Sequence, residues 1–131
     1  MKSRETMIQL FRFKTEEKRR KLIDLETMIR DFESMARDLD RQIEAEHEKT
    51  GVSDSSHFKY STLAKATANR RDNLTASVRD LKVRLADARQ DYELAVAELK
   101  KAEQLEDRDD KSRRVRMDSS EHGATRTIGQ V

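Results

Sequence analysis

The residues of this 131-residue sequence that have the chemistry for catalysis or metal binding do not fall into a working pattern. His47, His57 and His122 are scattered along the chain, whereas metal sites draw on His side chains at defined, close spacings. His47 and His57 flank a turn-rich segment with Glu46 and Glu48 nearby, and we interpret them as solvated surface side chains. The sequence has no glycine-rich phosphate loop, no Gly-x-Ser-x-Gly turn and no cysteine nucleophile. It therefore predicts a protein that is not an enzyme and that holds neither a metal nor a cofactor.

The most basic run, residues 18–21, is the best candidate for binding a phosphate backbone. Acidic residues lie on both sides of it, and successive helical residues point around the axis instead of forming one stripe. The whole chain has 28 Lys and Arg against 26 Asp and Glu, so no strong field attracts nucleic acid. We interpret Lys18, Arg19 and Arg20 as contacts for a protein partner. The basic residues of 113–116 lie among aspartates, and we interpret them as a solvated face or a protein contact more than as a phosphate track.

The amino-acid composition indicates which kind of secondary structure carries these residues. Charged residues make up 41% of the chain and hydrophobic residues only 34%, too few to build a rounded globular core. The chain has no proline and only 3 glycines, which favours long helices over disorder. The composition therefore predicts helices that bury a narrow stripe, and it disfavours an enzyme with an enclosed pocket.

Apolar residues recur at alternating spacings of three and four in both halves of the sequence, the a/d pattern of a coiled coil. The first stripe predicts a helix over about 3–50 that Gly51 ends, with polar seam positions at Thr15 and Lys18. The second stripe predicts a helix over about 58–116, capped by Asp54 or Ser61, after a loop over about 51–57. The predicted seam consists of Ile8, Phe11, Leu22, Leu25, Ile29, Phe32, Leu39, Ile43, Leu74, Val78, Leu81, Leu85, Tyr92 and Leu99.

Two stripes joined by a short loop predict an all-α fold, an elongated antiparallel two-helix coiled-coil hairpin over residues 1–116. In an antiparallel pair, the residue numbers of two seam residues that face each other always add up to the same value. A value of 110 fits this sequence, and it pairs Leu25 with Leu85. Residues 117–131 have no apolar period and predict a disordered tail. The alternative is a parallel homodimer of continuous helices, which the Gly51 region disfavours. Pairing of the hairpin with a second copy stays open, so a homo-oligomer is compatible with the sequence.

The N-terminal end of the first predicted helix is apolar nearly all round. With Ile8 and Phe11 in the seam, Met7 falls at position g, Leu10 at c and Phe13 at f. A helix that is apolar on several sides is typically buried on more than one face. We therefore predict a partner surface that includes Met7, Leu10 and Phe13, at the end of the hairpin where both termini meet. Self-association through these residues is the alternative.

Several segments are more distinctive than the heptads, which coiled coils share. They are MKSRET (1–6), FRFK (11–14), EKRR (17–20), residues 23–35, TGVSD (50–54), HFKY (57–60), AKA (64–66) and RRDNL (70–74). Together they resemble FliJ-type flagellar export proteins of alphaproteobacteria, over roughly residues 1–110.

The resemblance implies a cytoplasmic component of the flagellar type III protein export apparatus, located peripherally at the flagellar base. Members of this family are antiparallel two-helix coiled coils that look like the stalk of rotary ATPases. They are thought to insert the end that carries both termini into a hexameric export ATPase, to contact the export gate protein and to escort export chaperones. The resemblance therefore implies a role in motility, in which this chain regulates the ATPase as a stalk.

Two other functions remain open from the sequence. A generic coiled-coil chaperone or adaptor would bind partners along its length, and a nucleic-acid-associated protein would use the basic runs. The longest apolar run is residues 94–97, so we expect no membrane insertion and no signal peptide, and a cytoplasmic location.

Overall fold

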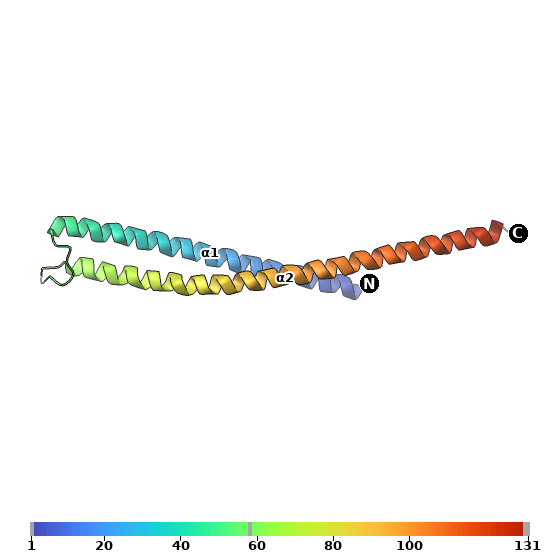
Figure 1. Ribbon diagram of the computed structural model, residues 1–131, viewed down its shortest axis with the longest axis horizontal. Helices are drawn as coiled ribbons and strands as arrows, with labels where there is room; N and C mark the ends of the chain where they lie inside the picture. The colour runs from blue at the N-terminus through green and yellow to red at the C-terminus, as the bar shows by residue number, and fades with distance from the viewer. Residues whose placement is uncertain (1, 58, 130–131) are drawn as a thin grey trace. The chain divides into compact units, whose positions relative to one another are not determined.

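Two long helices make up the fold of this protein. The computed structural model describes residues 2–57 and 59–129, with side chains described for residues 3–57 and 59–119. Helix α1 spans Lys2–Thr50 and helix α2 spans Thr62–Gly129, and the described residues contain no strand (Figure 1). The predicted all-α hairpin is confirmed.

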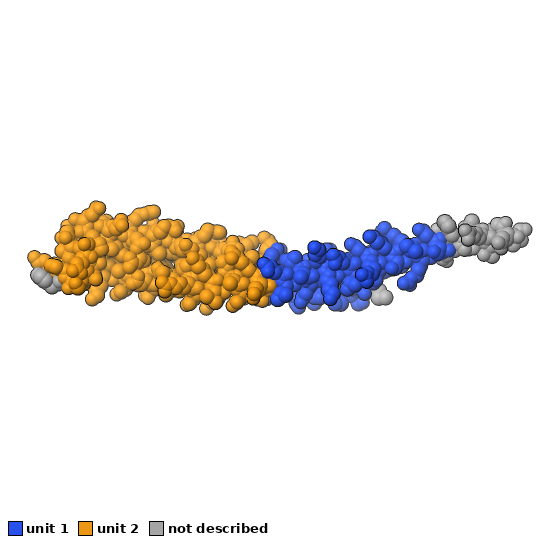
Figure 2. Space-filling view, in the orientation of Figure 1, with its two compact units in different colours: residues 1–18, 92–131 blue, residues 19–91 orange. Residues whose placement is uncertain are grey.

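The chain divides into two compact units, which are coloured separately in Figure 2. Unit 2 contains residues 19–91, which include the end of α1, the loop and the first half of α2. Unit 1 contains residues 1–18 and 92–131, the beginning of α1 and the remainder of α2.

Unit 2 holds nearly all of the buried apolar side chains. Its largest core cluster consists of Leu25, Ile29, Val78, Leu81, Leu85 and Ala88, with Leu22 and Phe32 packed against it. Each fully buried Leu or Ile of such a cluster contributes about 1.5–3 kcal/mol relative to an exposed one. Further along the same seam, Leu39 and Ile43 on α1 and Ala64 and Thr67 on α2 are also buried. The hydrophobic stripe therefore holds the two helices of unit 2 together over their whole length.

Two polar contacts between the helices agree with the predicted antiparallel register. In unit 2, Arg71 Nη1 lies 2.9 Å from Asp40 Oδ1, so the numbers of the two residues total 111. In unit 1, Thr15 Oγ1 lies 3.3 Å from Ala95 O, a pair with numbers totalling 110. The hydrogen bonds that Arg71 donates to Asp40, and then those to Asp72, raise the pKa of Arg71 above its ordinary value, while burial opposes this shift. Arg71 therefore stays charged at a seam position where it pairs with α1.

The loop between the helices is longer than the sequence predicted. Gly51 adopts a left-handed φ of 72° and its N–H donates to His47 O at 2.8 Å, which ends α1 at the predicted place. Asp54 then accepts hydrogen bonds from the hydroxyl and the backbone N–H of Ser56, which lower the pKa of the Asp54 carboxyl. This turn is therefore most stable above the ordinary pKa of an aspartate, and it loosens as the pH falls through the lowered value.

Ser61, and not Asp54, caps the second helix. Its hydroxyl oxygen accepts a hydrogen bond from the Ala64 N–H at 3.2 Å and donates to Glu46 Oε1 at 2.8 Å. The cap places the start of α2 at Thr62 and not at the expected residue 58, which itself lies outside the described residues. Before this cap, the His57 N–H donates to Asp54 O and the Tyr60 N–H donates to His57 O, both at 3.0 Å.

We predict that Ser61→Ala lowers the free energy of unfolding by about 1 kcal/mol, because it removes the cap of α2 and leaves Glu46 without its partner. Urea unfolding followed by circular dichroism measures this effect. Ser55→Ala, an exposed loop position, is the matched control and should stay within about 0.5 kcal/mol of the wild type. Equal effects of the two substitutions would contradict the assignment of the cap.

The C-terminal end of α2 differs from the expectation. The sequence predicted that the helix ends near residue 116 and that residues 117–131 are disordered, whereas α2 continues to Gly129. The extension contains no proline, which is compatible with a continued helix despite the missing apolar period. Residues 130 and 131 lie outside the described residues.

Candidate functional site

The structure places the fourteen predicted seam residues in two groups. The first group is buried: Ile8, Leu25, Ile29, Leu39, Ile43, Val78, Leu81 and Leu85. The second group is half-buried: Phe11, Leu22, Phe32, Leu74, Tyr92 and Leu99. All fourteen therefore lie closer to the helix interface than to the exposed faces.

Two buried residues, Ala64 and Thr67, lay outside the predicted stripes. Ala88, which is also buried, follows Leu85 in the second stripe at the expected interval of three. Small or polar side chains carry little hydrophobic signal, so a search for large apolar residues passes over them. Stepping backwards from Leu74 by alternate intervals of three and four reaches Arg71, Thr67 and Ala64, and that extension would have found them.

Unit 1 buries very little, and this is the central observation about the candidate site. Among its described side chains Ile8 is the only buried one, whereas unit 2 buries ten. Met7, Leu10 and Phe13 are 53%, 52% and 60% exposed, although all three are large and apolar. They follow one another at intervals of three along α1, so neighbouring members of the set adjoin on the helix surface. We call Met7, Leu10 and Phe13 the apolar patch.

Polar contacts also join the two helices of unit 1. Arg4 pairs with Asp109, and Arg12 Nε lies 3.6 Å from Glu103 Oε1. The hydroxyl of Thr15 donates to Phe11 O at 2.7 Å, and it also lies within reach of Ala95 O on α2. Exposed ion pairs of this kind contribute about 0–1 kcal/mol each. Unit 1 therefore has little core of its own and retains apolar surface that a partner can cover.

The predicted basic contacts are distributed over both units. Lys18 is half-buried and belongs to unit 1, whereas Arg19 and Arg20 are exposed and belong to unit 2. The predicted partner-binding residues therefore do not all belong to one compact unit.

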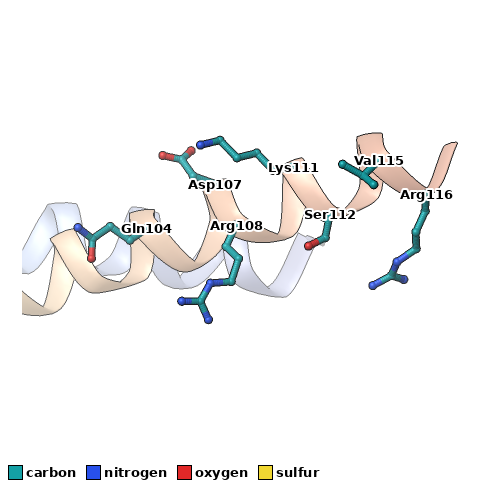
Figure 3. Close-up of a pocket in the computed structure, with 7 residues that line it drawn as sticks. All are labelled: Gln104, Asp107, Arg108, Lys111, Ser112, Val115 and Arg116. Atoms are coloured by element: carbon teal, nitrogen blue, oxygen red, sulfur yellow. The ribbon is translucent and has the colours of Figure 1, made fainter. Parts of the chain in front are cut away.

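A second surface feature of unit 1 lies on α2 alone. An open depression of about 720 Å³ is lined by Gln104, Asp107, Arg108, Lys111, Ser112, Val115 and Arg116. These residues recur at intervals of three and four on one side of α2, and Figure 3 shows Asp107 and Lys111 reaching toward each other while Arg108 and Arg116 extend separately. Only one helix lines the depression, so it offers a surface for contact and no enclosed site for a substrate.

His47 and His57 each make a separate contact in or beside the loop. His47 Nε2 lies 2.9 Å from the Tyr60 hydroxyl, with the two ring centres 5.4 Å apart, and His57 Nδ1 accepts the Lys59 N–H at 3.0 Å. The side chain of His122 lies outside the described residues. Over the part of the chain that the structure describes, no group of three or more His, Cys, Asp or Glu side chains is placed to hold a metal ion. Within the same part, neither helix has a stretch long and apolar enough to cross a membrane.

Comparison with known proteins identified no relative of this chain. No family model matches the chain, no curated protein matches it, and no solved structure matches it. The structure itself defines the protein as a helical hairpin. Its unit 1 has little buried core and carries the exposed apolar patch.

Proposed function

We propose that this protein is a non-enzymatic component of the flagellar type III protein export apparatus, which acts as a stalk-like regulator of the export ATPase and as an escort of export chaperones. Two arguments support the proposal. The first is the resemblance of residues 1–110 to FliJ-type proteins, and the second is that the helical hairpin has the fold which that resemblance implies.

The observation that carries the proposal is the apolar patch on unit 1. A stalk that enters the pore of a ring-shaped ATPase needs side chains that are exposed in the free stalk and contact the ATPase after insertion. Met7, Leu10 and Phe13 meet this requirement, because each leaves more than half of its surface exposed in the isolated chain. About half of each side chain remains to be buried, so each provides about half of the ~1.5–3 kcal/mol of full burial, before the costs of association.

The experiment that tests this proposal measures the ATPase activity of a purified flagellar export ATPase with and without the chain. We expect stimulation by the full chain and its loss after deletion of residues 1–13. Unit 2 lies outside the deleted segment and keeps its ten buried side chains, so the helicity of that unit should persist in circular dichroism. An unchanged ATPase rate with the full chain would contradict the proposal.

A generic coiled-coil adaptor is the second candidate, and exposed apolar residues of unit 2 such as Met28, Met35 and Val83 favour it. It predicts that substitutions along unit 2 weaken partner binding more than the deletion of residues 1–13 does. A nucleic-acid-associated protein predicts instead an affinity that falls steeply with salt, because each phosphate contact releases a counterion.

A further inference from the structure

A stripe of alternating aspartate and methionine runs along α1 in unit 2. Asp24, Met28, Asp31, Met35 and Asp38 follow one another at intervals of four and three, so they lie on one face of the helix. All five side chains are exposed. Asp38 pairs with Arg41, whereas Asp24 and Asp31 have no ion pair or hydrogen bond with the described residues. We call these five residues the Met–Asp stripe.

A groove lined by basic and apolar residues, which complement the aspartates and methionines of the stripe, lies between α1 and α2 of the same unit. Its volume is about 330 Å³, and it is lined by Glu33, Ala36, Arg37, Thr75, Val78, Arg79 and Lys82. Buried Val78 and half-buried Ala36 form an apolar floor. Arg37, Arg79 and Lys82 are exposed at the rim and have no ion pair with the described residues. The groove therefore presents three uncompensated cations around an apolar floor, against the single carboxylate of Glu33.

Stripe and groove match in charge, polarity and length. Asp24 and Asp31 of the stripe have no ion pair with the described residues, and neither have Arg37, Arg79 and Lys82 of the groove. Met28 and Met35 lie one heptad apart, about 10 Å along the helix, and Thr75 and Lys82 in the groove have the same separation. Methionine side chains are flexible and fill irregular apolar sites well. A helix that carries this stripe thus has suitable side chains for both the floor and the rim.

We propose that a second copy of this chain docks its Met–Asp stripe into this groove, so that α1 of one copy packs as a third helix against α1 and α2 of the other. Residues two apart on a helix point in nearly opposite directions, so Asp31 and Met35 face away from Glu33 and Arg37. Stripe and groove therefore occupy opposite sides of α1, and the contact joins unlike surfaces head to tail. This association rests on unit 2 alone and does not depend on the proposed function.

The first test measures the sedimentation velocity of the full chain over a concentration series at low and high salt. We expect the average mass to rise with concentration, and the association to weaken with salt because its charge pairs are partly exposed. Arg79→Glu combined with Lys82→Glu should weaken association at least about tenfold, since it reverses the charge of the rim. Lys100→Glu combined with Lys101→Glu makes the same charge change in unit 1 and should leave association unchanged. A wild-type chain that stays monomeric overturns the proposal, even if the groove binds an acidic helix of another protein.

The second test distinguishes a head-to-tail contact from any symmetric one. A groove variant, Arg79→Glu with Lys82→Glu, keeps an intact stripe, and a stripe variant, Met28→Ala with Asp31→Ala, keeps an intact groove. Each variant alone should lose self-association while keeping wild-type helicity in circular dichroism. A mixture of the two should form dimers with one chain of each kind, because the intact stripe of the first meets the intact groove of the second. A mixture that stays monomeric, or variants that associate as the wild type does, would place the contact elsewhere.

Discussion

Leu81→Ala is expected to lower the free energy of unfolding by about 2–4 kcal/mol, a large part of the total stability of a small domain. Leu81 is 5% exposed and lies in the core cluster of unit 2, so truncation removes buried contacts and leaves a cavity between the helices. Urea unfolding followed by the circular dichroism of the helices measures the loss.

Val83→Ala provides the control on the same helix. Val83 is 65% exposed and only two residues away, and it is therefore expected to change the free energy of unfolding by less than about 0.5 kcal/mol. If the two substitutions destabilise the protein equally, the seam does not run where the structure places it.

Leu10→Asp combined with Phe13→Asp is expected to abolish stimulation of the export ATPase and to leave the helicity of the chain unchanged. Both side chains are more than half exposed, so the isolated protein loses little packing. In a complex, each aspartate would bring an unpaired charge into an apolar contact, which is strongly unfavourable. Circular dichroism of the variant and the ATPase rate in its presence provide the two readings.

Val83→Asp is the matched control for the apolar patch, because it introduces the same charge at an equally exposed apolar position in unit 2. It should stimulate the ATPase as the wild type does. Loss of helicity in the double variant would instead mean that Leu10 and Phe13 belong to the fold, and the assignment of the patch would then be wrong.

The periodicity of the apolar residues was enough to predict the helical hairpin. Alternating intervals of three and four locate a stripe wherever its members are large, as from Leu22 to Ile43 on α1. The stop at Gly51 was predictable as well, because glycine adopts the left-handed conformation with φ of 72° that the end of α1 requires.

The positions that the sequence did not predict depend on contacts between distant residues. The choice between Asp54 and Ser61 as cap is settled by Glu46, which lies fifteen residues before Ser61 and accepts its hydroxyl. Burial of Ala64 and Thr67 follows from the register with α1 and not from their own weak hydrophobicity. The expected helix end near residue 116 rested on the loss of the apolar period, whereas α2 extends to Gly129 over a segment without proline.

The exposure of Leu10 and Phe13 was predictable from their heptad positions, which point away from the seam. The small core around them was not. The sequence did not indicate that unit 1 would bury only Ile8 among its described side chains, because the helices there have apolar residues at several seam positions. Unit 1 has one buried side chain among its described residues, whereas unit 2 has a continuous core. For this reason we propose the N-terminal part of α1 as the functional surface.

The most direct test of the proposed stalk is the stoichiometry of its complex with a hexameric flagellar export ATPase, measured by native mass spectrometry at chain concentrations low enough to prevent self-association. A single hairpin that occupies the pore of a ring predicts one chain for six ATPase subunits, and loss of that complex with Leu10→Asp and Phe13→Asp. Six chains per hexamer, or a complex that survives both substitutions, would show that the protein does not act as a stalk through its apolar patch.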